Sequence, residues 1–178
     1  MKKNMMAIVG MLMFVGSNAV AMTAAQVKNR FDLAIDTTFG GRTDSSFYST
    51  PFDSANINAC YDAAAKVKAF VYDHSKNLFG SRDSLLNEAA AELERVTMDV
   101  INAIKITKGA TTAPGIKASI GSLDSLESKI NGANSLANKV AKESFTISEK
   151  KESKSVLGAA YGKLLDLIRK AVRAAVKK

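Results

Sequence analysis

Tryptophan is absent from this chain of 178 residues, which has one cysteine, one histidine and two prolines. A single cysteine excludes an intramolecular disulfide framework, so packing must hold the fold together. A metal site needs several histidine, cysteine or carboxylate groups at ligand spacing, and His74 is the only histidine. We therefore expect no metal ion.

Sequence patterns that mark common enzymes are missing as well. The chain has no Gly-x-Ser-x-Gly, phosphate-binding loop, dinucleotide-binding glycine pattern, Glu-x-x-His pair or Cys-x-x-Cys-His run. Cys60 lacks a nearby base, because His74 lies fourteen residues later on the same predicted helix. Cys60 also sits between Ile57 and Ala64 on an apolar stripe, which predicts a buried thiol and a monomer. We expect a non-enzymatic protein without catalytic residues or cofactors.

The first residues resemble a secretory signal. A pair of lysines precedes the apolar run Met5–Gly16, and Ala19–Ala21 supplies the small residues that a signal peptidase accepts. The run is too short to span a bilayer, which needs about 20 residues. No cysteine lies at the cleavage point, so no lipid anchor is expected. The sequence predicts a cleavable signal over residues 1–21 and one domain over 22–178, exported from a bacterium to the periplasm, the cell surface or the extracellular medium.

Apolar residues recur at helical spacing in five segments, and no segment shows the alternation of a strand. The clearest pattern is a heptad seam of six residues that are expected to face inward: Leu86, Ala89, Leu93, Val96, Val100 and Ala103. Four long helices of matched length with short connections favour an all-α, antiparallel up-and-down bundle, flanked by a short N-terminal helix. The predicted helices are 24–37, 53–77, 83–108, 116–142 and 155–177, and Asp53 or Ser54 is expected to cap the second. The segment 110–115, which contains Pro114, is expected to break the helical pattern, and the polar segment 144–155 to be a connector. Tyr61 and Val176 are placed on inward apolar stripes.

Positive charge is concentrated at the C-terminal end. Residues 149–178 contain nine basic and three acidic residues, whereas 22–148 contain 14 of each sign. On a helix over 155–177 the cations share a face roughly 120° wide, at 100° per residue. This basic face has two interpretations. It is either the solvent-exposed outer face of a helix at the edge of the bundle or a binding site for an anionic partner. The candidate binding residues are Lys163, Arg169, Lys170, Arg173, Lys177 and Lys178.

The apolar arc of the same helix is wider than one face of a bundle needs. This favours an alternative, in which the helix leaves the bundle and inserts into a membrane surface or forms a pore.

A second ambiguous region is the predicted loop 38–53, which is polar and Gly-rich but carries four aromatic residues. Most loop aromatics pack onto the end of a bundle; alternatively, Phe47 and Tyr48 form a contact surface.

The plan of an export signal, a Lys-rich helical bundle and a basic C-terminal helix resembles small bacterial surface adhesins such as the spirochaete decorin-binding proteins. That resemblance rests on architecture and composition, and those proteins carry a lipobox cysteine that this chain lacks. It implies binding to host glycosaminoglycan, extracellular matrix or an envelope component. The expected partner is an anionic polymer, a membrane surface or an acidic protein, and no nucleic acid is expected for an exported protein.

Overall fold

The computed structural model describes residues 22–39, 53–79, 84–143 and 148–177. All regular structure in these ranges is helical, so the predicted all-α class is confirmed. The first helix is short and the other four are long, as expected. The helices are α1 (Ala24–Phe39), α3 (Ser54–Phe79), α4 (Ser84–Gly109), α5 (Ala113–Glu143) and α6 (Ser148–Val176).

Side-chain caps explain where the first two helices begin. Before α1, the Thr23 hydroxyl accepts from the Gln26 amide at 3.3 Å, and the Gln26 side chain accepts from the Thr23 amide at 2.9 Å. This reciprocal pair is a capping box. Before α3, the Asp53 carboxylate accepts from the Ala55 amide at 2.9 Å, so of the two candidates, Asp53 and Ser54, Asp53 is the cap.

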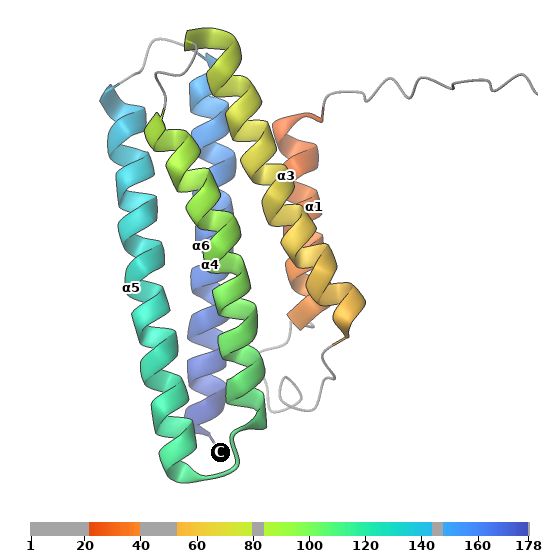
Figure 1. The fold of residues 1–178 in the computed structure, drawn as a ribbon, viewed down its shortest axis with the longest axis vertical. Helices are drawn as coiled ribbons and strands as arrows, with labels where there is room; N and C mark the ends of the chain where they lie inside the picture. Colours follow the sequence, from red (N-terminus) through yellow and green to blue (C-terminus); the bar gives the residue numbers. More distant parts are fainter. Residues whose placement is uncertain (1–21, 40–52, 80–83, 144–147, 178) are drawn as a thin grey trace, which may run out of the picture.

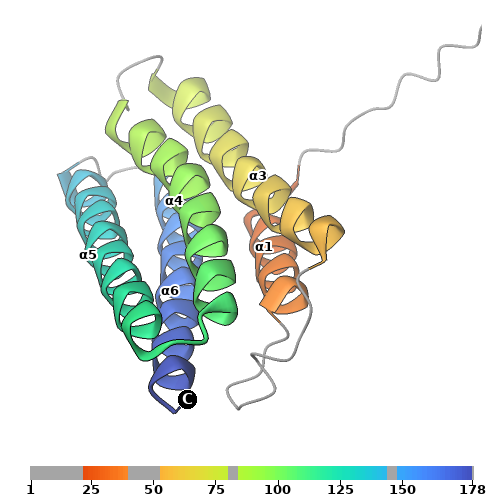
Figure 2. The same cartoon turned by 60° about the horizontal axis from the view of Figure 1, so that its bottom comes forward.

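The five helices form a bundle in which α6 is central. Figure 1 shows α5, α4 and α3 in front, with α6 behind α4 and α1 behind α3. The view in Figure 2 also places α6 and α1 behind this front row. α6 packs against each of the other four helices, whereas α1 packs mainly against α3 and α6, and α5 mainly against α4 and α6. The C-terminal helix is therefore not at an edge of the bundle, which is where one interpretation of its basic face placed it.

The core follows the predicted apolar stripes. Six seam positions of α4 were expected to face inward, and all of them are buried or packed against the core. At the centre, the buried Tyr161 hydroxyl of α6 donates to the Ala89 carbonyl of α4, which joins the two helices. The largest fully buried side chains are Tyr161, Phe31, Ile35, Leu86, Leu93, Ile101, Ile104, Leu123, Ile130, Leu157, Leu164 and Ile168.

α5 begins three residues before its predicted start at 116. The prediction treated Pro114 as a helix breaker, but Pro114 lies in the first turn of α5. A proline is tolerated there because the first amides of a helix have no intrahelical acceptor. The Thr112 hydroxyl instead accepts from the Gly115 amide at 3.4 Å and caps the new start.

α6 begins at Ser148 rather than at the predicted residue 155, so the polar segment 144–155 is not wholly a connector. The polar composition of this segment predicts a loop, but some of its polar residues pack against the rest of the bundle. Ser153 is 1% exposed, and the Glu152 carboxylate accepts from the Ala24 amide of α1 at 3.3 Å. A tertiary contact with α1 therefore extends the helix into a segment whose composition is that of a loop.

Two residues placed on the inward stripes are exposed. Tyr61 is 37% exposed, and it interacts with Glu94 on the surface between α3 and α4. Val176 is 70% exposed and is the last residue of α6. A hydrophobic residue at the margin of an arc or at a helix end need not reach the core.

Candidate anion-binding face

The outward face of α6 carries the cations expected from the sequence. Its side toward α3 and α4 is filled by buried aliphatic residues and Tyr161, so the charged residues lie on the opposite side. Asp166, Arg169 and Arg173 are exposed, whereas Lys163 and Lys170 are partly exposed. The structure therefore brings the predicted basic residues to one surface of one helix.

Two of these cations are engaged in ion pairs that join helices. Lys163 Nζ lies 2.7 Å from an Asp36 carboxylate oxygen of α1. Arg169 Nε donates to Glu127 of α5 at 3.2 Å, and Arg169 also lies 3.9 Å from Asp166 in its own helix. Each carboxylate partly neutralises its cation, so Lys163 and Arg169 contribute to assembly of the bundle and present less charge to a partner.

The three cations nearer the C-terminus differ from this pair. Within the described part of the chain, Lys170, Arg173 and Lys177 form no ion pair. At 100° per residue, their positions fall within about 60° of one another around the axis of α6. Lys170 and Arg173 lie in the last two turns of α6 and Lys177 follows its last residue, where the helix dipole favours positive charge. Lys178 and the candidate contact residues Phe47 and Tyr48 lie outside the described residues.

The wide apolar arc of α6 has a structural explanation. Leu157, Leu164 and Ile168 are fully buried, and the helix contacts four neighbours rather than one. A helix surrounded on three sides needs a correspondingly wide apolar surface. No helix in the described ranges is sufficiently long and apolar to cross a bilayer.

Cys60 and His74 are both accounted for by packing. Cys60 is 0% exposed, which confirms its predicted burial, and the loss of hydration raises the pKa of its thiol to about 12. His74 Nδ1 lies 2.9 Å from the Phe70 carbonyl oxygen, and its ring lies against the Phe70 ring. Among the described residues, no three histidine, cysteine or acidic groups are placed to hold a metal ion.

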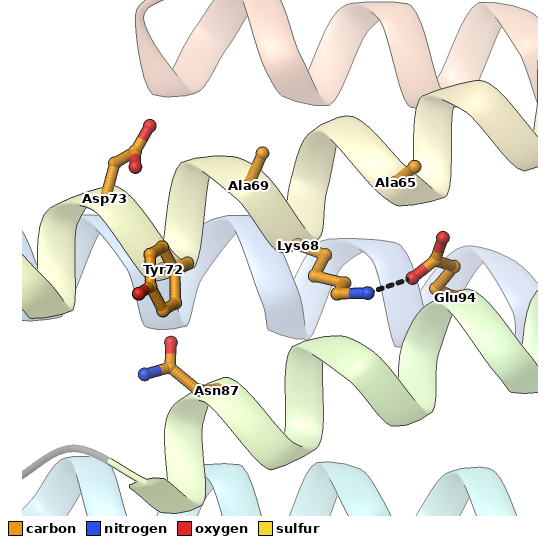
Figure 3. Close-up of a pocket in the computed structure, with 7 residues that line it drawn as sticks. All are labelled: Ala65, Lys68, Ala69, Tyr72, Asp73, Asn87 and Glu94. Atoms are coloured by element: carbon orange, nitrogen blue, oxygen red, sulfur yellow. Dashed lines mark hydrogen bonds and ion pairs between the residues drawn. The ribbon is translucent and has the colours of Figure 1, made fainter. Parts of the chain in front are cut away.

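One feature of the surface was not predicted. A hollow of about 320 Å³ lies between α3 and α4 (Figure 3). It is bordered at one end by an ion pair between Lys68 and Glu94, whose atoms are 2.6 Å apart. The signal in the sequence was the pair of alanines, Ala65 and Ala69, on the face of α3 that meets α4. These alanines lie beside the apolar stripe of α3, so the stripe alone does not reveal the hollow. The lining residues are Ala65, Lys68, Ala69, Tyr72, Asp73, Asn87 and Glu94.

Comparison with known proteins adds no relative. No family model matches the chain, and neither a curated protein nor a solved structure matches it significantly. The function must therefore be inferred from the side chains and their surroundings.

Proposed function

We propose that the protein is a non-enzymatic binding protein that holds an anionic partner on the C-terminal part of α6. The binding residues are Lys170, Arg173 and Lys177. The observation that carries this proposal is the contrast within one face: these three cations have no ion-pair partner among the described residues, whereas Lys163 and Arg169 do. A group of like charges without ion-pair partners attracts polyanions. Such exposed charges contribute little to the stability of the folded protein.

The partner class follows from charge and from the expected export of the chain. An exported protein meets sulfated glycans and anionic envelope polymers, and the proposed role is adhesin-like. Arginine is well suited to sulfate and phosphate groups because its guanidinium presents paired donors in one plane. Arg173 is therefore expected to contribute more to binding than either lysine.

The proposal assumes the antiparallel up-and-down order inferred from the sequence. Cross-helix pairs support it. Lys68 of α3 pairs with Glu94 of α4. Tyr72 follows Lys68 by one turn of α3, and it lines the same hollow as Asn87, which precedes Glu94 by two turns of α4. The two helices therefore run in opposite directions at this contact. In this order the C-terminal part of α6 lies beside the early part of α5, so both flank the same end of the bundle.

The test is retention on immobilised heparin, a sulfated glycan, as a function of salt concentration. Changing Lys170, Arg173 and Lys177 together to Ala is expected to lower the eluting salt concentration markedly, because exposed ionic contacts are screened by salt. The folded state should be unaffected, since these side chains make no ion pair in the described structure.

A matched control removes one arginine and two lysines away from the C-terminal part of α6. Arg30, Lys66 and Lys151 are exposed on α1, α3 and the first turn of α6, and changing all three to Ala alters the net charge equally. Elution of this control close to the unmodified protein would support a localised site. Equal elution of the two triple variants would show that retention reflects net charge alone and would refute the proposal.

The membrane-active alternative requires a large structural change, whereas binding of a polyanion does not. To insert, α6 would have to leave its contacts with four helices and remove Leu157, Leu164 and Ile168 from the core. Dye release from anionic vesicles tests this directly. Insertion would be favoured if the unmodified protein causes leakage and a cross-linked bundle, in which α6 cannot leave its neighbours, does not. Absence of leakage with both would favour binding of a polyanion by the folded protein.

A further inference from the structure

The hollow between α3 and α4 exists because the side chains that face it in the middle are small. Ala65 and Ala69 leave space on α3, one helical turn apart. Its volume of about 320 Å³ is at the lower end of the range for small-molecule sites. Figure 3 shows the two ends of the hollow: Lys68 and Glu94 at one, and Tyr72 and Asn87 at the other.

The charged end is already satisfied. Glu94 accepts from Lys68 at 2.6 Å and also interacts with the Tyr61 hydroxyl. The hydrogen bond from Lys68 lowers the pKa of the Glu94 carboxyl, so the carboxylate stays ionised beside its partner. Because the charges of Lys68 and Glu94 cancel, the net charge of the lining side chains is that of Asp73 at the rim.

The other end contains an unsatisfied acceptor. Asn87 Oδ1 is buried and has no hydrogen-bond partner. In Figure 3 this oxygen is directed from α4 across the groove toward Tyr72 of α3. A buried acceptor without a donor is unfavourable, and such atoms are uncommon in folded proteins. Tyr72, which is 47% exposed, borders the same end of the hollow.

We propose that this hollow binds a small organic ammonium compound. The ammonium donates to Asn87 Oδ1, while an apolar body of the ligand covers Ala65, Ala69 and the Tyr72 ring. The Asp73 carboxylate, which Figure 3 shows directed away from Asn87, adds a negative charge to the lining without contacting the ammonium. The unsatisfied acceptor selects a donor, and the residual negative charge of the lining selects a cation. This site is on α3 and α4, so it is independent of the anion-binding face on α6.

The experiment is a titration of the ¹⁵N-labelled protein followed by amide chemical shifts. The probe is benzylammonium, with benzyl alcohol and benzoate as compounds of the same size that are neutral and anionic. Benzylammonium is expected to shift amides of residues 65–73 and 87–94 and to bind roughly 5- to 10-fold more tightly than the alcohol, because hydrogen bonds to charged groups are stronger. Benzoate should cause no localised shift.

Two variants test the assigned atoms. Asn87→Leu removes the acceptor, and Ala69→Leu fills the hollow from an exposed position. Both should abolish the localised shifts. The control, Ala59→Leu, fills a separate hollow of about 300 Å³ between α1 and α3 and should leave binding unchanged.

Three results would overturn the proposal. Localised shifts that persist in Asn87→Leu would show that its oxygen is not the acceptor. Equal affinities for benzylammonium and benzyl alcohol would remove the selection for a cation. An absence of localised shifts with all three probes, in a protein whose spectrum shows a folded bundle, would show that the hollow is not a ligand site.

Discussion

The helices α5 and α6 are similar in length but differ in how they use their residues. α6 contacts four helices, and buried residues occur along it from Ser153 to Ala175. α5 packs mainly against α4 and α6, and the side of α5 away from them is rich in serine and glycine. The breadth of an apolar arc thus reports how many neighbours a helix has. A wide arc beside positive charges does not by itself indicate a membrane-active helix.

Truncation of a buried leucine should give the largest difference between the two helices. Leu164 of α6 is 0% exposed, whereas Leu136 of α5 is 42% exposed. We expect Leu164→Ala to lower the free energy of unfolding by about 3–5 kcal/mol, because it leaves a cavity, and Leu136→Ala to lower it by less than about 1 kcal/mol. Denaturant unfolding followed by circular dichroism measures both. Similar losses at the two positions would contradict the central placement of α6.

A smaller effect is expected from the hydroxyl group that joins α6 to α4. Tyr161→Phe removes the donor to the Ala89 carbonyl and keeps the ring in place. Because that carbonyl is buried, we expect a loss of about 1 kcal/mol in the free energy of unfolding. The same measurement detects it. An unchanged or higher stability would mean that this hydrogen bond does not help to hold the two helices together.

The elements and the core were largely predictable, whereas the neighbours of each helix were not. Periodicity identified all five helices because each buries one stripe, and it correctly placed Cys60 in the core. The starts of α5 and α6 were missed for different reasons. Pro114 was read as a breaker although it fits a first turn, and residues 148–154 are helical through a contact with α1 that no local pattern reveals.

Only part of the candidate site could be predicted. The basic face of α6 follows from helical geometry, so its residues were identified from spacing alone. Which of them are neutralised depends on Asp36 and Glu127, which are far away in the sequence. The hollow between α3 and α4 was not predicted, because it depends on the register of two helices and on which side chains are missing between them.

Glycine substitutions in α5 test whether this helix has fewer neighbours than α6. A Cβ atom added at Gly121 or Gly132 would meet nothing within 4 Å, so neither glycine is required by packing. We expect each change to Ala to raise the free energy of unfolding by about 0.5–1 kcal/mol, because alanine loses less backbone entropy in a helix. Gly115→Ala is the matched control, since its Cβ would lie 3.0 Å from the Thr112 hydroxyl that caps α5, and it should gain less. Destabilisation by Gly121→Ala would indicate that another element covers this face of α5.

The smallest effect concerns acid sensitivity at the contact between α3 and α4, in which α6 takes no part. The hydrogen bond from Lys68 lowers the pKa of Glu94 in the folded state below its unfolded value of about 4.3. The unfolded state therefore binds a proton first, so the contribution of Glu94 is present above about pH 5 and declines as the pH falls through the folded pKa. Glu94→Gln should lower the urea midpoint at pH 7 and have less effect at pH 3, because the unfolded state is by then mostly protonated and the contribution of the carboxylate is declining. The effect is modest because Lys68 is 45% exposed and surface ion pairs are weak. If the substitution changes the midpoint equally at both pH values, the ion pair between α3 and α4 contributes nothing that depends on charge.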